Sequence, residues 1–481
     1  MEEHKAQEKK PAARLLLAGG LVLATALLGT VARGKGPSVA PSAHGPTQFT
    51  APTTGPVTFS GTLDRTTVLR GTDGVVRIEL LIGAQAPPIE QPPRRPTDLL
   101  VILDRSGSMG GEKLLQARAA IRTLVAQLAP QDRFGLVTYA NDAALVIPLA
   151  NADADARDRW LNTVADIQAD GGTNMSSGLD LGLDAIERHR EAGRAQRVIL
   201  LSDGLANQGD ASPNGLVRRA TRAARGEYML TTVGIGADFN EALMTALADA
   251  GTGNYYYLKV GDDLASIFAR EFDATRTTIA SGLAVRIEPG SGVRVLDAAG
   301  YPLEPTAGAI LFRPGSVFAG QERRIWVTLA VPAQGVGETA LGRFVLSYAN
   351  GGAPTSLAFS EVPRVACVQN TDDFYAGIDV PSWSRSVVVD AYNSMQAQVA
   401  RAVKAGRRDA ALKAIGEFRA EAAPMNARLQ SAPVAGQLHA ADKLEADVAA
   451  AFSGSNQPAK QNELSKERGA EALDLRRAGS K

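Results

Sequence analysis

The side chains best suited to chemistry in this sequence are five oxygen donors that lie far apart along the chain. The run D-R-S-G-S directly follows an apolar segment, 99–103, and a second apolar segment, 198–201, is followed by S-D-G. The run G-G-T-N lies between them. Carboxylate and hydroxyl oxygens are ligands that hard cations prefer. We therefore predict a site for Mg²⁺, with Mn²⁺ or Ca²⁺ as alternatives, at Asp104, Ser106 and Ser108, and the two later runs offer Thr173 and Asp203 as further oxygen sources.

The two apolar segments are the elements that must position these donors. Each is short, uncharged and closed by Gly and Ser, which is typical of a buried parallel strand that leads into a loop. Because ligands bind at the carboxyl ends of the strands of an open α/β sheet, we expect Asp104 and Asp203 to meet at one edge. Their two negative charges balance a divalent ion. The alternative, a Ser/Gly-rich turn with satisfied hydroxyls, does not explain why both strands end in aspartate.

The three motifs, in this order, resemble the von Willebrand factor type A (VWA) family. Asp104, Ser106 and Ser108 match its D-x-S-x-S motif, and Thr173 and Asp203 match its later Thr and Asp. The resemblance implies a metal-ion-dependent adhesion site, where an acidic side chain of another protein completes the coordination. We therefore expect a non-enzymatic protein that binds a partner presenting Asp or Glu through an open Mg²⁺ site.

Composition limits the other classes of function. Lys plus Arg and Asp plus Glu each number 51, so the formal net charge is zero, and no basic footprint for nucleic acid is present. The sequence has no H-E-x-x-H, G-x-S-x-G or P-loop motif, and no base or nucleophile stands with the predicted ligands. The single cysteine, Cys367, is read as a buried structural residue.

A second function that the resemblance leaves open is a subunit of a metal-chelatase-like or MoxR-type ATPase complex, because such complexes also use VWA domains. An export signal would count against it, since those partners need cytoplasmic ATP. The wider resemblance is to exported bacterial VWA proteins with β-rich flanks, some similar to calcium-activated chloride channel regulators, over roughly residues 58–367.

The segment Leu15–Ala32 is uncharged and rich in Leu and Ala, and basic residues are denser before it than after it. At about 1.5 Å per residue it is roughly 27 Å long, near the lower limit for crossing a bilayer. It is either a retained anchor in the inner membrane or a cleaved secretory signal. Both place the body outside the cytoplasm, in the periplasm or at the cell surface.

Strand and helix patterns alternate from residue 98 to about 273, which predicts a doubly wound, mostly parallel α/β sheet with one antiparallel edge hairpin. Short β-rich segments follow up to residue 367 and indicate a β-sandwich-like module. The strands within residues 58–85 are too few to stand alone. We therefore expect them to pair with the later strands, so that the α/β domain is inserted within one β module.

Two amphipathic segments joined at Gly406 predict a C-terminal helical hairpin. The predicted boundaries are 1–36 for the anchor or signal, 37–56 for a Pro/Gly/Ser-rich linker, 57–96 for the first strands and a proline hinge, 97–276 for the VWA domain, 277–370 for the β-sandwich-like module, 383–452 for the helical hairpin and 453–481 for a polar tail.

Overall fold

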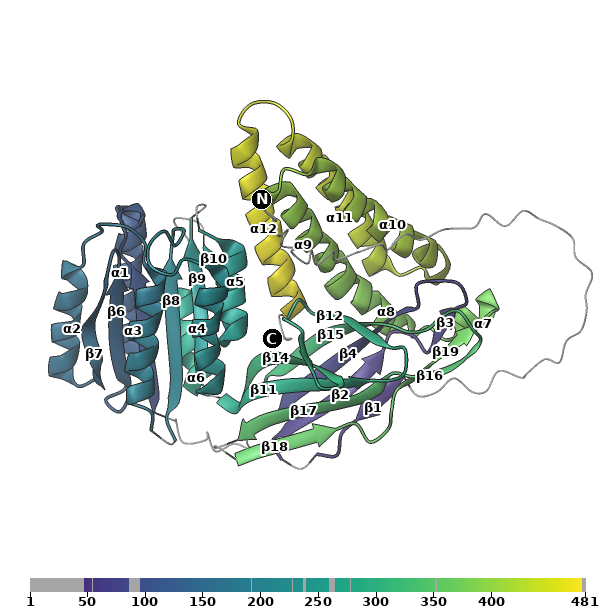
Figure 1. Cartoon of the computed structure of the whole chain (residues 1–481), viewed down its shortest axis with the longest axis horizontal. Coiled ribbons are helices and arrows are strands. Elements are labelled where there is room, and N and C mark those ends of the chain that lie inside the picture. Colours follow the sequence, from purple (N-terminus) through teal and green to yellow (C-terminus); the bar gives the residue numbers. More distant parts are fainter. Residues whose placement is uncertain are drawn as a thin grey trace, which may run out of the picture.

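A computed structural model describes residues 47–477, apart from residues 54, 86–95, 192, 227, 237–238, 259–263, 277 and 351–352. The predicted anchor or signal, Leu15–Ala32, lies outside the described residues, so its prediction stands as made. Within the described part, no helix is both long and apolar enough to cross a membrane. Figure 1 shows an α/β unit, a β-sandwich and a bundle of helices, in contact with one another.

The α/β unit is built on one six-stranded sheet in the order β10-β9-β8-β5-β6-β7. All neighbours are parallel except β6 and β7, which form an antiparallel edge pair. This confirms the predicted doubly wound sheet and its edge hairpin. The strands are β5 (Thr97–Asp104), β6 (Arg133–Tyr139), β7 (Ala143–Asn151), β8 (Ala195–Ser202), β9 (Met229–Ile235) and β10 (Thr252–Leu258).

Six helices cover both faces of this sheet. Because side chains alternate along a strand, Leu99 and Val101 of β5 pack on one face, and Leu100 and Ile102 pack on the other. The first face carries α1, α2 and α6, and the second carries α3, α4 and α5. The helices are α1 (Glu112–Gln127), α2 (Ala154–Asp166), α3 (Met175–Arg188), α4 (Pro213–Arg225), α5 (Glu241–Ala250) and α6 (Leu264–Arg276).

The β-sandwich is formed by strands from both sides of the α/β unit, as the sequence predicted. The first sheet joins β1 (Gln48–Thr50), β2 (Val57–Leu63) and β4 (Val75–Ala84) to β15 (Glu322–Ala330) and β12 (Arg294–Ala298). The second runs β13 (Glu304–Thr306), β14 (Ala309–Phe318), β11 (Thr278–Pro289), β17 (Gly342–Asn350) and β18 (Ala353–Ala358). The α/β unit is therefore an insertion between β4 and β11.

One hydrophobic core lies between the two sheets and holds the sandwich together. Phe359 stacks on Phe59 of the first sheet and on Phe344 of the second, with ring centroids 4.7 Å and 5.5 Å apart. A third, small sheet joins β16 (Gly337–Ala340), β19 (Arg364–Val368) and β3 (Thr67–Leu69). Cys367 of β19 is buried in the same core, in keeping with a structural role.

The C-terminal helical unit is larger than the predicted hairpin. It contains α7 (Thr371–Ala376), α8 (Val380–Arg385), a wide π-helical turn (Ser386–Ala391), α9 (Tyr392–Lys404), α10 (Arg408–Leu429), α11 (Ala432–Ala451) and α12 (Gln457–Arg477). The prediction of a polar tail from residue 453 is wrong, because α12 packs against α9 and buries Ser465, Lys466 and Ala472. Polar residues in a helix between two units are buried without giving an amphipathic pattern.

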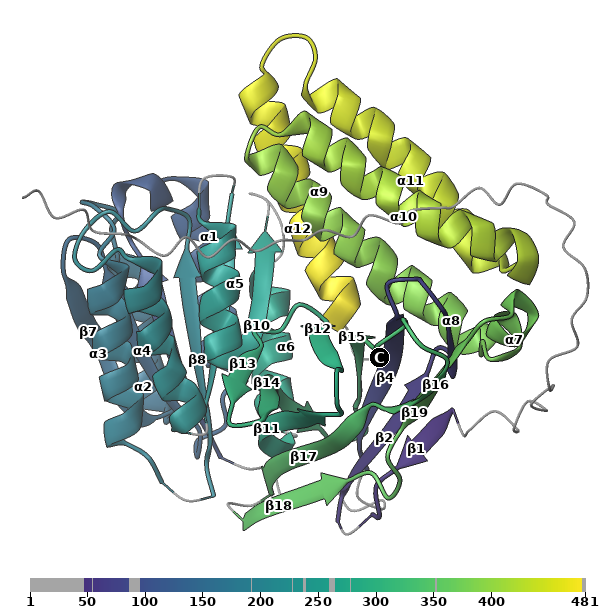
Figure 2. The same cartoon turned by 45° about the vertical axis from the view of Figure 1, so that its right-hand side comes forward.

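Helix α12 lies between the α/β unit and the rest of the helical unit (Figures 1 and 2). The ammonium of Lys466 donates to the Phe239 carbonyl, 3.3 Å away, and stands 4.3 Å from the centroid of the Phe239 ring. Gly469 lies over Glu241 at the start of α5, where an added Cβ would be 2.5 Å from Glu241 Oε1. The C-terminal helix therefore joins the helical unit to the inserted unit.

Candidate metal centre

Asp104 is the last residue of β5 and is fully buried at the carboxyl edge of the sheet. Its Oδ1 accepts a hydrogen bond from the backbone N–H of Ser106 at 2.8 Å. Its Oδ2 accepts one from the Ser202 hydroxyl at 2.7 Å. Since Ser202 ends the neighbouring parallel strand β8, this bond ties the ends of the two strands together at the predicted edge.

Ser106, Ser108 and Asp203 form a continuous chain of oxygen atoms beside it. The hydroxyls of Ser106 and Ser108 are 3.1 Å apart, and the Ser108 hydroxyl donates to Asp203 Oδ1 at 2.9 Å. Ser106 and Asp203 are buried, whereas Ser108 is exposed. These oxygen donors are therefore covered by the protein at Ser106 and Asp203, and solvent reaches them at Ser108.

Thr173 is held at the same edge by the loops around it. Its backbone N–H donates to the Asn207 side-chain oxygen at 2.9 Å, and its carbonyl accepts from the Asn207 backbone at 3.1 Å. On the other side, Gly107 N–H donates to the Gly171 carbonyl at 3.0 Å. The three segments that carry the predicted ligands are thus bonded to one another, although they lie far apart in sequence.

Gly204 shows how the hydroxyls converge. A Cβ added to Gly204 would lie 3.4 Å from Ser108 Oγ and 3.6 Å from Thr173 Oγ1. Both hydroxyls therefore face one small space above a residue that has no side chain. The structure brings the five predicted residues to one edge, and Gly204 leaves room between two of them.

The charges at this edge favour a cation. Burial raises the pKa of the Asp104 carboxyl, and the nearby charge of Asp203 raises it further, while hydrogen bonds from Ser106 and Ser202 oppose the rise. The second carboxylate, Asp203, already forms an ion pair, because Lys113 Nζ lies 2.5 Å from Asp203 Oδ2. Two carboxylates and three hydroxyls form a donor set that suits a hard divalent ion.

Among the residues that the structure describes, no group of three or more His, Cys, Asp or Glu side chains is arranged to hold a metal ion. The candidate centre agrees with that finding, since it contains two carboxylates and takes its other oxygens from Ser and Thr. Two carboxylates are enough to balance the charge of one divalent ion.

Comparison with known families decides what the inserted unit is. The family model of the von Willebrand factor type A domain matches residues 98–270. This unit is a VWA domain. The resemblance drawn from the three sequence motifs is thereby confirmed.

The relatives of the VWA domain are distant, and most of their length lies outside the match. The Escherichia coli protein YfbK is 29% identical over 195 residues, which are 40% of this chain and 33% of that protein. Human inter-alpha-trypsin inhibitor heavy chain H4 is 30% identical over 159 residues, 32% of this chain and 17% of that protein. The chain therefore spans a third or less of these two relatives.

A solved structure of a von Willebrand factor type A protein from Catenulispora acidiphila is similar over 91% of this chain and 99% of its own, with a TM-score of 0.64 and 17% identity. At that identity the likeness shows the fold alone. It extends well beyond the VWA domain, so the arrangement of insertion and flanks is shared with that protein.

Sequence reasoning missed three residues that shape the VWA centre: Lys113, Ser202 and Asn207. Ser202 was read as the end of a strand, and its hydroxyl holds Asp104. Asn207 lies four residues after the aspartate of the S-D-G run, and its side-chain oxygen accepts the hydrogen bond that holds Thr173. Lys113 had no distinguishing signal, because a lysine in the first turn of a helix is ordinarily a solvent-facing residue.

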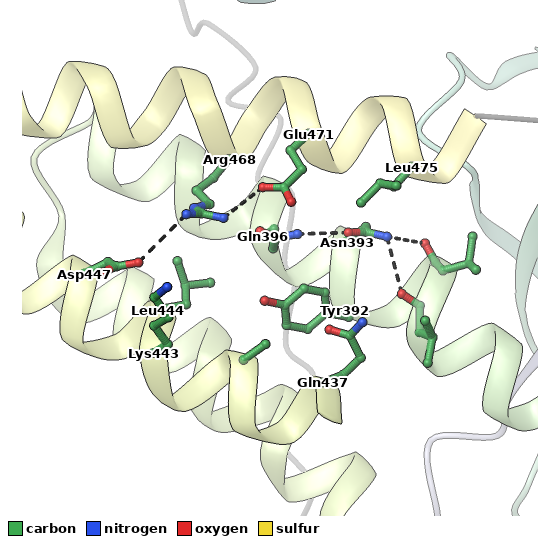
Figure 3. A pocket seen from close by; sticks show the side chains of 13 residues that line it. Tyr392, Asn393, Gln396, Gln437, Lys443, Leu444, Asp447, Arg468, Glu471 and Leu475 are labelled. Atoms are coloured by element: carbon green, nitrogen blue, oxygen red, sulfur yellow. Dashed lines mark hydrogen bonds and ion pairs between the residues drawn. The ribbon is translucent and has the colours of Figure 1, made fainter. Parts of the chain in front are cut away.

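Outside the VWA domain, a hollow of about 420 Å³ lies between α9, α11 and α12 (Figure 3). Arg468 contacts Glu471 at 2.8 Å and Asp447 at 3.9 Å across it. Gln396 donates to Asn393, which donates to the carbonyl of Val389 in the π-helical turn. Gln396 Oε1 and Arg468 Nε are left without a hydrogen-bond partner among the described residues. The charged residues that line the hollow are Lys443, Asp447, Arg468 and Glu471, whose charges cancel, so it has no excess charge for an ionic ligand.

Proposed function

We propose that this protein binds a partner protein through a divalent metal ion, Mg²⁺ in the first instance, and that the partner supplies an Asp or Glu carboxylate. The observation that carries the proposal is the convergence of two buried carboxylates and three hydroxyls at one edge of the VWA sheet. Adhesion and protein interaction are the general roles of VWA domains, and the finer claims of metal dependence and carboxylate recognition are ours.

Each residue has a distinct part in this proposal. Asp104 and Asp203 would supply the two negative charges that balance a divalent ion, and Ser106, Ser108 and Thr173 would supply neutral oxygens, directly or through water. When bound, the ion supplies an electrophilic position on the exposed side of the site. Ser108 marks that side, because it is the exposed member of the chain of oxygens.

Binding without turnover is the reading that the side chains favour. The polar contacts of Asp104 and Asp203 are made by hydroxyls, a backbone N–H and the Lys113 ammonium. None of these groups is a base within reach of a nucleophile at neutral pH. A general base or an activated nucleophile is what metal-assisted hydrolysis would need.

The test is calorimetric titration of Mg²⁺ and Mn²⁺ into the wild-type protein and the Asp104→Asn variant. Asparagine keeps the shape of the side chain and can still bond to Ser106 N–H and the Ser202 hydroxyl, so we expect the fold to persist. Loss of one of two charged ligands should weaken metal binding at least about a hundredfold, or 2.7 kcal/mol. Circular dichroism checks the fold.

The control is Asp142→Asn, which removes the same charge from the exposed turn after β6, at the same edge of the sheet. It should bind metal as the wild type does. Absence of Mg²⁺ and Mn²⁺ uptake by the wild type would overturn the proposal. A pull-down from envelope extract, with and without EDTA, then asks whether a partner depends on Asp104.

We also propose that the body of the protein works outside the cytoplasm, held by Leu15–Ala32 or released after its cleavage. The support is the uncharged segment with basic residues before it. Fractionation of cells that express the full chain, with protease added to spheroplasts, tests this. Protection of the VWA domain from the added protease would contradict it.

A further inference from the structure

Lys113 is the residue in contact with the metal centre that the proposed function does not use. It lies in the first turn of α1, and 19% of its side chain is exposed. Its ammonium is 2.5 Å from Asp203 Oδ2 and 3.2 Å from the Ser108 carbonyl oxygen. Since Ser108 donates to the other oxygen of Asp203, both oxygens of this buried carboxylate are engaged.

The contact between Lys113 and Asp203 offsets the cost of burying two negative charges close together. Asp104 and Asp203 are both fully buried, and the negative charge of Asp203 disfavours the charged form of Asp104. Burying a carboxylate without a compensating cation is unfavourable, so a cation at this position stabilises the fold. The Lys113 ammonium offsets one of the two charges and takes an oxygen that a metal ion would otherwise attract.

We propose that Lys113 is a built-in counter-cation for this centre, which holds Asp203 when no divalent ion is bound and competes with the ion for that carboxylate. The inference rests on the proposed metal site. It assigns Lys113 a role in setting metal affinity, in addition to its contribution to stability. The tether in α1 gives the ammonium a high local concentration, so bulk salt does not replace it.

The proposal predicts that the substitution Lys113→Met strengthens metal binding and, in the absence of metal, lowers the stability of the fold. Lys113→Met keeps the length and the apolar stem of the side chain but removes the ammonium. Metal binding should become about tenfold tighter, which is 1.4 kcal/mol, because the competitor and a repelling charge are both gone. In EDTA the same variant should unfold at a lower temperature, because two buried carboxylates then lack a cation. A side chain that merely packs would change both quantities in the unfavourable direction.

The experiment measures Mn²⁺ affinity by calorimetry and the unfolding temperature in EDTA, for the full chain in each case. The control Arg122→Met removes a positive charge from the exposed side of α1 and should change neither quantity. Lys113→Arg keeps the charge and should keep affinity within about threefold of the wild type, which is under 0.7 kcal/mol. Circular dichroism confirms that each variant is folded.

The outcomes separate this inference from the proposed function. If the wild type binds Mn²⁺ and Lys113→Met binds it no more tightly, or is equally stable in EDTA, the counter-cation role is wrong and the metal site stands. If only Lys113→Met takes up Mn²⁺, Lys113 excludes the ion from the wild type, so the competition is confirmed and the proposed function of the wild type fails. If neither protein takes up Mn²⁺, the metal site and the counter-cation role both fail.

Discussion

Gly204 leaves space at the candidate metal centre because it has no side chain. It follows Asp203 directly, and Ser108 Oγ and Thr173 Oγ1 both lie within 4 Å of the point where its Cβ would be. Gly204 does not adopt a positive φ, so an alanine would meet no backbone strain there. An added methyl group would therefore act on the space between the hydroxyls and leave the chain path unchanged.

Gly204→Ala is accordingly expected to weaken Mn²⁺ binding about tenfold, or 1.4 kcal/mol, because the methyl group fills space that a metal ion and its waters need. Its unfolding temperature in EDTA should match that of the wild type. Gly107→Ala is the matched control, since its Cβ would lie 3.6 Å from the Gly171 carbonyl, in ordinary contact. Wild-type Mn²⁺ affinity in Gly204→Ala would show that no ion sits between these hydroxyls.

At the scale of elements, α12 is the helix that links the VWA domain to the helical unit. It covers Glu241 in the first turn of α5, and burial raises the pKa of that carboxyl to about 7, although the charges of Lys404 and Lys466 oppose the rise. The folded state therefore favours the protonated form of Glu241 more strongly than the unfolded chain does. The stabilising contribution is present below about pH 4.5 and is lost as the pH rises towards 7.

Glu241→Gln should remove this dependence, because glutamine stays neutral at every pH. We expect the variant to unfold at the same temperature as the wild type near pH 4 and at a higher temperature at pH 8. Differential scanning calorimetry from pH 4 to pH 8 measures the difference. A difference that stays constant over this range would mean that Glu241 keeps an ordinary pKa beneath α12.

At the scale of the whole molecule, the VWA domain is inserted at a single point of the sandwich. Strand β4 ends beside the turn that joins β14 to β15, where Gly320 N–H donates to the Ala84 carbonyl. Strand β11 begins beside the same turn, where Thr278 pairs with Phe318. The chain therefore leaves the sandwich and returns to it at neighbouring positions.

This arrangement predicts that residues 86–277 can be replaced by a short Gly/Ser linker without loss of the sandwich. The sandwich core is formed by residues 49–84 and 280–367, so none of it is removed. We expect a cooperative unfolding transition from the shortened protein, and a circular dichroism spectrum with both β and helical contributions, because α7–α12 are retained. Expression only as an aggregate, with a linker of any length up to about ten residues, would show that the sandwich needs the VWA domain to fold.

The α/β unit was predictable because its signals are local. Leu99 to Asp104 and Val198 to Asp203 are apolar runs that end in an acid, and buried parallel strands require such runs whatever surrounds them. The same logic predicts that Asp104 and Asp203 share an edge, because the carboxyl ends of parallel strands meet there. Thr173 was added by the resemblance to the VWA family, since it lies in a loop between two helices. Periodicity and motif spacing are therefore enough to predict a fold in which each strand and helix has its own sequence pattern.

The sequence alone determined the doubly wound sheet, the insertion in a β module and the five candidate ligands. Only the tertiary structure decided that Lys113 stands on Asp203, that Ser202 holds Asp104, and that the stretch after residue 453 is a helix packed on the VWA domain. Each of these rests on contacts between side chains far apart in the chain. The local sequence does not show which residue a first-turn lysine, a strand-end serine or a polar helix will contact in the folded protein.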